Sequence, residues 1–194
     1  MVVRLWHPPA RVKRPGGARS GLPGAVLATL LLAASITGAA AGWETFTAAE
    51  AGFSAEFPAP PTFTDIVEMQ GETFAFFHDY RALTEDAVFL VDVVRFTPAV
   101  RADRTDAELL ETAVTGVAGG DCEASTPRAV PVSDHIAHDV TFRCPDGLTM
   151  RARFRIAGEW LYQIGVGGGP GVAAGPDASR FVDSFRLMAD RSPQ

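Results

Sequence analysis

Three strand-like segments in the last third of the chain are joined by very short turns, and this arrangement most limits the fold. The turns are Pro145-Asp146-Gly147 and Ala157-Gly158-Glu159, whose Gly residues are typical of links between antiparallel strands. The sequence therefore predicts an antiparallel meander. Its strands are Ile136 to Cys144, Leu148 to Ile156 and Trp160 to Val166.

The middle strand of this meander alternates apolar and basic residues. Because side chains of a strand alternate between its two faces, one face carries three arginines and the other is apolar. Arginine forks suit carboxylates, so the basic face is a candidate binding face for an anionic ligand or a protein partner. The alternative interpretation is a basic face balanced by acidic residues of the same chain. The arginines are Arg151, Arg153 and Arg155.

The first half of the chain predicts further strands by the same period-two pattern. Trp43 to Thr47 and Phe53 to Phe57 form an expected hairpin around Gly52. Ala87 to Phe96 is apolar on both faces, which is typical of a central strand covered on both sides. The remaining expected strands are Phe63 to Met69, Thr73 to Arg81 and Ala129 to Val132.

Two helices are expected, one after each group of strands. Thr105 and Glu108 have the spacing of a capping box, the residues that follow recur at helical spacing, and Gly119-Gly120 ends the first helix. The second helix is expected over Ala178 to Leu187, with Asp177 as its N-cap. The predicted fold class is α+β, an antiparallel sheet of about seven strands with helices packed on it.

The first 41 residues have the pattern of a secretory signal peptide. Five basic residues and no acidic residue precede an apolar run over residues 25–41, which ends in small side chains. We expect cleavage after Ala41, a single domain over residues 42–194, no membrane span after cleavage, and a periplasmic or secreted product. The alternative is an uncleaved membrane anchor.

Removal of this segment makes the chain strongly acidic. Residues 42–194 keep 12 basic and 23 acidic residues, a net charge of −11. Nucleic acid and anionic lipid surfaces are therefore not expected as partners. Lys13 is the only lysine, so the exported part has no lysine for a phosphate loop or a Schiff base.

The only two cysteines are Cys122 and Cys144. Disulfides persist outside the cytoplasm, so we expect these two residues to form one. The alternative, half of a metal site, lacks a neighbouring Cys-x-x-Cys or His-x3-His sequence.

Both ends of the exported part resemble a known family. The first motif, which follows Trp43, is Gly52-Phe53-Ser54-x-x-Phe57-Pro58-x-Pro60. The second is Gly158-x-x-Leu161-Tyr162-Gln163, and the third, near the end of the sequence, is Arg180-Phe181-Val182-Asp183-Ser184-Phe185-Arg186-Leu187. This pattern resembles exported bacterial proteins of the Mog1/PsbP-like group. The resemblance implies an α/β/α sandwich and an accessory or binding role. It supplies no functional residue.

The remaining chemical motifs are weak. His135 and His138 lie three apart on a strand, which directs them to opposite faces and disfavours a shared metal ion. Ser133-Asp134-His135 are consecutive and follow no Gly-x-Ser-x-Gly elbow, which disfavours a hydrolytic triad. The Gly-rich segment over residues 165–171 is too far from the next helix for a phosphate loop. No catalytic, cofactor-binding or metal-ligating residue is therefore assigned.

These observations predict an exported binding or accessory module without enzymatic activity. The expected partner is an unknown protein or a small anionic ligand, and no cofactor is expected. The alternatives are an uncharacterised extracytoplasmic enzyme, which would need a cleft with perturbed titratable groups, or a structural surface protein.

Overall fold

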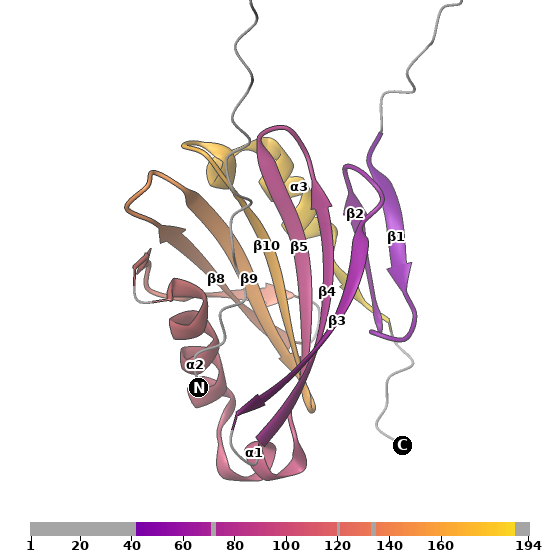
Figure 1. The fold of residues 1–194 in the computed structure, drawn as a ribbon, viewed down its shortest axis with the longest axis vertical. Coiled ribbons are helices and arrows are strands. Elements are labelled where there is room, and N and C mark those ends of the chain that lie inside the picture. Colours follow the sequence, from indigo (N-terminus) through magenta and orange to yellow (C-terminus); the bar gives the residue numbers. More distant parts are fainter. Residues whose placement is uncertain (1–41, 71–72, 120, 133–134, 189–194) are drawn as a thin grey trace, which may run out of the picture.

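The computed structural model describes residues 42–70, 73–119, 121–132 and 135–188. The expected signal peptide lies outside these residues. Within them, no helix has the length and apolar character needed to cross a membrane. The strands form two separate sheets, one of eight strands and one of three (Figure 1).

The larger sheet is antiparallel throughout and confirms the predicted α+β class. Its strand order is β3-β4-β5-β10-β9-β8-β6, and β7 also pairs with β8. The strands β8, β9 and β10 are the predicted meander. The bounds are β3 Thr62–Gln70, β4 Thr73–Leu83, β5 Ala87–Arg95, β6 Glu123–Ala124, β7 Arg128–Val132, β8 His135–Arg143, β9 Thr149–Ala157 and β10 Trp160–Gly168.

The predicted N-terminal hairpin is present but belongs to the smaller sheet. It consists of β1 (Glu44–Ala48) and β2 (Phe53–Phe57), and β11 (Arg186–Leu187) pairs with the free side of β2. Figure 1 shows this hairpin standing to one side of the large sheet. The first and last described strands of the chain therefore share one sheet.

One face of the large sheet is covered by helix α3 (Pro176–Ser184) and the smaller sheet. Phe181 of α3 and Phe57 of β2 have ring centroids 4.9 Å apart, and Phe53 stacks on Phe185 at 5.6 Å. These rings pack with Phe89, Val91 and Val93 of β5 in one hydrophobic core.

The opposite face is covered by helix α2 (Asp106–Ala118). Thr105 and Glu108 form the predicted capping box, and Gly119 ends the helix with φ 61°, which a residue without Cβ adopts freely. The buried side of α2 packs against β8, β9 and the adjoining ends of β5 and β10. The helix residues in this second core are Leu109, Leu110, Ala113, Val114 and Val117.

The C-terminal helix differs from the prediction in both of its ends. Gly175, not Asp177, is the N-cap, and Asp177 lies in the first turn where its charge favours the helix dipole. The helix ends at Ser184 rather than Leu187 because residues 186–187 pair with β2. The structure also contains a short helix α1 (Pro98–Asp103) and a 3-10 turn at Val172–Ala174, neither of which was predicted.

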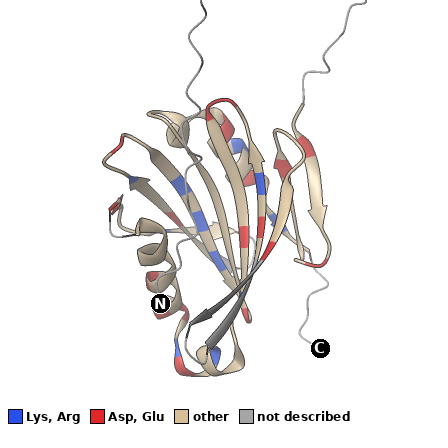
Figure 2. Cartoon of the chain, viewed as in Figure 1, with Lys and Arg blue, Asp and Glu red and all other residues tan. Residues whose placement is uncertain are grey.

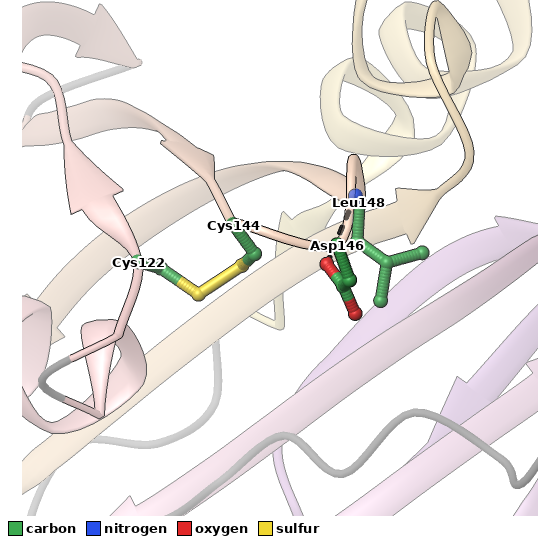
Figure 3. The surroundings of a disulfide bond; sticks show 4 residues. All are labelled: Cys122, Cys144, Asp146 and Leu148. Atoms are coloured by element: carbon green, nitrogen blue, oxygen red, sulfur yellow. Dashed lines mark hydrogen bonds between the residues drawn. A yellow bond between two sulfur atoms is a disulfide. The ribbon is translucent and has the colours of Figure 1, made fainter.

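Cys122 and Cys144 form the predicted disulfide, with sulfur atoms 2.02 Å apart (Figure 3). The bond joins the segment before β6 to the residue after β8. Next to it, the Asp146 side chain accepts a hydrogen bond of 3.1 Å from the Leu148 amide and so shapes the turn into β9. The covalent link fixes the edge of the sheet against the end of α2.

Candidate functional site

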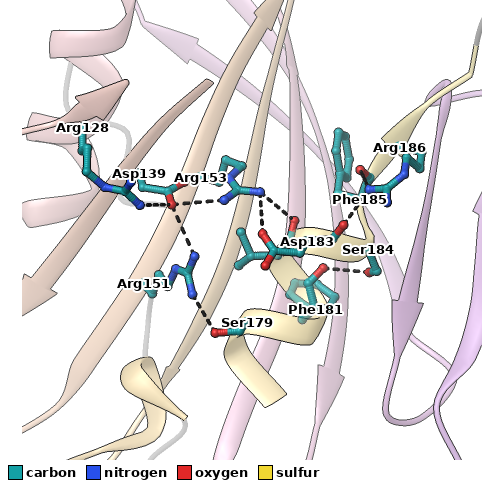
Figure 4. A network of polar contacts seen from close by, with 11 residues as sticks. Arg128, Asp139, Arg151, Arg153, Ser179, Phe181, Asp183, Ser184, Phe185 and Arg186 are labelled. Carbon is teal, nitrogen blue, oxygen red and sulfur yellow. Dashed lines mark hydrogen bonds and ion pairs between the residues drawn. The ribbon is translucent and has the colours of Figure 1, made fainter. Parts of the chain in front are cut away.

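Arg151 and Arg153 lie on the face of β9 that packs against α3, opposite the apolar face of the strand (Figure 4). Arg155 shares this face by strand alternation, and Figure 2 shows basic positions spaced along β9. Arg153 donates from Nε to Asp139 Oδ1 at 2.6 Å and from Nη2 to Asp139 Oδ2 at 3.1 Å. Its Nη1 reaches Asp183 at 2.9 Å. Arg151 bridges Asp139 and Ser179 at 3.3 and 3.0 Å. Acidic residues of the same chain thus engage Arg151 and Arg153.

Charge and burial act against each other in this cluster. Burial raises the pKa of Asp139, but the hydrogen bonds from Arg153 and the charges of Arg153 and Arg151 outweigh it and lower the pKa below its ordinary value. Burial lowers the pKa of Arg153, and its bonds to Asp139 more than reverse this. The cluster ties α3 to the sheet through ionised partners.

Arg155 is not part of that cluster. Its Nε is buried, and no hydrogen bond to this atom exists among the described residues. Burial lowers the pKa of its guanidinium, partly offset by Tyr162. The structure therefore brings Arg151 and Arg153 together on Asp139 and leaves Arg155 apart. The anion or partner face remains a prediction.

A cavity lies between α2 and the strands β6 to β9, and we call it the α2 groove. Its volume is about 910 Å³, in the range of sites for small organic ligands. Phe154 and Ile156 of β9 belong to its wall, together with His138 of β8. The other lining residues are Asp106, Ala107, Leu110, Glu111, Val114, Thr115, Ala124, Ser125, Thr126, Pro127, Ala129 and Ile136.

The charged groups of the groove are carboxylates. The lining contains Asp106 and Glu111 but neither lysine nor arginine. Asp106 is already paired with Arg101 at 2.7 Å, so its charge is compensated. Apolar side chains form most of the wall, and the exposed Ile136 extends it to the surface. The groove therefore suits an apolar molecule and repels an anion.

A series of directly paired residues runs across the sheet from the groove to its middle strands. On the α2 face, His138, Phe154, Gln163, Asp92 and Asp79 lie opposite one another on neighbouring strands, and we call this series the polar row. Directly opposed residues have Cβ atoms about 5 Å apart. His138 and Phe154 line the α2 groove, whereas the other three lie beyond it. Figure 2 shows acidic positions side by side on β4 and β5.

The inner part of the polar row is buried and incompletely paired. Asp92 and Gln163 are 1% and 0% exposed. Both amide atoms of Gln163 and the Oδ2 of Asp92 have no hydrogen-bond partner among the described residues. Most buried polar atoms in native proteins are paired, so three such atoms on adjacent strands mark this place as unusual.

The pKa values of the two carboxyl groups of the polar row are both raised, but to different extents. Burial and the neighbouring Asp79 carboxylate raise the pKa of Asp92 well above its ordinary value. Burial also raises the pKa of Asp79, but an ion pair and hydrogen bond with Arg81 oppose this effect. Both carboxyl groups are therefore harder to ionise than a free aspartic acid, and the effect is larger at Asp92. Such pairs serve acid-base catalysis in enzymes, yet neither carboxyl lines the α2 groove.

The histidine motif contributes one residue to the groove, His138. Residues 133–134 and the side chain of His135 lie outside what the structure describes. His78 contacts Asp65 at 2.5 Å and stacks on Phe63 at the other end of the sheet. Among the described residues, no group of three His, Cys, Asp or Glu side chains could hold a metal ion.

Sequence patterns did not predict that Asp92 and Gln163 form a buried polar site, although Gln163 belongs to one of the family-like motifs. Asp92 is the one acidic residue inside the largely apolar stretch Ala87 to Phe96, and a carboxyl group in the middle of a strand covered on both faces is a signal of a buried polar site. Gln163 gives no comparable signal because a lone Gln within a strand is common at exposed positions.

The comparisons with known proteins concern the fold. No protein-family model and no curated protein matches the chain. The chain is similar to the solution structure of cyanobacterial PsbP (CyanoP) from Synechocystis sp. PCC 6803, with a TM-score of 0.54 and 13% sequence identity. The match covers 78% of this chain and 95% of that one. The predicted likeness is confirmed at the level of architecture, and the chain has a PsbP-like fold.

Proposed function

We propose that the protein is an exported binding module that holds a small, uncharged ligand with an apolar body in the α2 groove. The observation that carries the proposal is the groove itself, about 910 Å³ in volume and walled mostly by apolar side chains. A cavity of this size is typical of sites that bury most of a small organic molecule.

The charge of the groove selects against anions. A ligand carboxylate would lie near Glu111 and would find no lysine or arginine among the lining residues. A cation would gain little from Asp106, which Arg101 already neutralises. The partner of lowest electrostatic cost is therefore a neutral molecule, in contrast to the anionic ligand expected at the arginine face.

Export is the second part of the proposal. Three features support it: a basic segment followed by an apolar one at the N-terminus, the Cys122–Cys144 disulfide, and the PsbP-like fold. Intact-mass measurement of the protein recovered from the periplasm or medium tests it. We expect loss of residues 1–41, and a product that retains them would contradict cleavage.

Titration of the purified protein with octan-1-ol, followed by calorimetry, tests the groove. We expect saturable binding to the wild-type protein. Ala107→Trp fills the groove from α2 and should weaken binding at least about tenfold, since the indole occupies the space of the alkyl chain. Ala102→Trp, at an exposed position of α1 outside the lining, is the matched control and should bind like wild type. Absence of binding, or equal binding by both variants, would refute the proposal.

A further inference from the structure

His138 is a polar residue in an apolar part of the α2 groove wall. It pairs directly with Ala129 of β7 and Phe154 of β9, and all three residues line the groove. The residues two positions away on β8, which share its face, are Ile136 and Val140. None of these four neighbouring side chains can donate or accept a hydrogen bond. The sheet around His138 therefore supplies no side-chain partner for its imidazole.

The imidazole also has no partner elsewhere in the described part of the chain, where none of the hydrogen bonds or ion pairs involves His138. The side chain is half-buried. Polar atoms in an apolar wall are costly unless they are hydrogen-bonded, so the ring nitrogens need water or a ligand in the groove. The other polar residues of the lining are exposed, so bulk water solvates them. They are Asp106, Glu111, Thr115, Ser125 and Thr126.

A ligand that enters the groove displaces water from this imidazole. A wholly apolar ligand would leave the ring nitrogens unpaired, whereas a ligand with one polar end group can replace the water and its hydrogen bond. A neutral imidazole has one N–H donor and one unprotonated acceptor nitrogen. A hydroxyl group can donate to the acceptor nitrogen or accept from the N–H, so it matches whichever nitrogen faces the groove. An ether oxygen can only accept.

We propose that His138 is the polar anchor of the α2 groove and that its imidazole binds the hydroxyl group of an apolar alcohol. This inference rests on the proposed function, since it names the polar end of the same ligand. The apolar body of the alcohol lies against groove residues such as Leu110, Val114 and Ile156. The hydroxyl donates a hydrogen bond to the unprotonated ring nitrogen, which no ether can do.

The experiment compares octan-1-ol with its isomer 1-methoxyheptane, which has the same heavy atoms but no hydrogen-bond donor. Calorimetric titration of the wild-type protein at pH 8 should show the alcohol bound about fivefold more tightly, as expected for one hydrogen bond. His138→Phe keeps a planar ring but removes both nitrogens, so it should bind the alcohol no more tightly than the ether. His138→Gln keeps a hydrogen-bond acceptor and should retain part of the preference.

His78→Phe is the matched control, because it makes the same change at a partly exposed histidine of β4 that lies outside the groove lining. It should keep the wild-type preference for the alcohol. Nitrogen NMR of the imidazole rings supplies a second readout, which a purely structural role of His138 would not change. Octan-1-ol should shift a ring-nitrogen resonance of His138 and leave those of His78 in place.

The outcomes separate the two proposals. If both probes bind the wild-type protein equally, or if His138→Phe keeps the preference for the alcohol, His138 does not bind the hydroxyl and this inference is refuted while the groove stands. If His138→Phe does not fold, the NMR titration of the wild-type protein decides, and unchanged His138 resonances in the presence of bound octan-1-ol refute the inference. If neither probe binds the wild-type protein, the proposed function falls as well.

Discussion

Asp139 and Arg153 face each other on neighbouring strands beneath α3, joined by two hydrogen bonds of 2.6 and 3.1 Å. Their side chains are 8% and 10% exposed. The pair is the connection between the basic face of β9 and the helix, because the same guanidinium also reaches Asp183 of α3 at 2.9 Å. The contribution of this pair to the free energy of unfolding depends on both charges being present.

Asp139→Ala should destabilise the protein by about 3–5 kcal/mol, since it leaves Arg153 buried without its main counter-charge. Urea unfolding monitored by circular dichroism measures the change. Glu56→Ala is the control: its ion pair with Arg180 is half-exposed, with side-chain exposures of 35% and 49%, and should cost no more than about 1 kcal/mol. Equal losses in the two variants would show that the Asp139 cluster contributes no more than a surface pair.

The pH dependence of stability should differ in sign between Asp92 and Asp139. Because the folded-state pKa of Asp92 is raised above 3.8, its neutral form favours folding at acid pH, and this contribution is lost as pH rises. Asp92→Asn should therefore gain stability relative to wild type from pH 4 to pH 7, by at most about 1.4 kcal/mol per pH unit. Parallel stability profiles for the two proteins would contradict a raised pKa of Asp92.

For Asp139 the sign is reversed, because its folded-state pKa lies below 3.8. Its contribution is present above that value and disappears as pH falls through the folded pKa. Asp139→Ala should thus differ most from wild type near neutral pH and least in strong acid. Urea titrations at a series of pH values provide the measurement, and a difference that grows toward acid pH would overturn this assignment.

Loss of the Cys122–Cys144 bond should reduce stability by about 3 kcal/mol, the chain-entropy value for a loop with a sequence separation of 22. A Cys122→Ser, Cys144→Ser double variant, melted beside wild type, measures it. Reductant should lower the melting temperature of wild type and leave the double variant unchanged. A response of the double variant to reductant would mean that the effect does not come from this bond.

Two adjacent glycines at the end of β10 should respond differently to alanine. A Cβ on Gly168 would lie 2.4 Å from the Asp86 carbonyl oxygen and 2.9 Å from Val172 Cγ2, whereas a Cβ on Gly169 meets no atom within 4 Å. Gly168→Ala should cost about 1–3 kcal/mol, as overpacking does, and Gly169→Ala should be much milder. Chemical denaturation of both variants is the test, and equal stabilities would contradict the close approach.

The sequence predicted those parts of the fold that depend on neighbouring residues. The capping box of Thr105 and Glu108, the stop at Gly119, and the meander joined by two short turns all follow from local chemistry, and the structure contains each of them. The prediction for the last helix was wrong at its end, since Phe185 continues the helical spacing of Phe181 while Arg186 and Leu187 pair with a strand from the other end of the chain.

The candidate site depends on contacts that no local pattern reveals. Asp92, Gln163 and Phe154 become neighbours only through the pairing of β5, β10 and β9, and the α2 groove needs the placement of α2 over that same face. The arginines of β9 were recognised from their alternation, but their partners Asp139 and Asp183 come from a different strand and from α3. The alternation of residues along a strand predicts on which face a side chain lies, but not which residues cover that face.

The short strand β11 has a consequence for the order of folding. Its pairing with β2 means that the small sheet requires residues 186–187, almost the last that the structure describes. The β1–β2 hairpin therefore lacks its third strand until residues 186–187 have been synthesised. The small sheet is therefore completed later in synthesis than every strand of the large sheet.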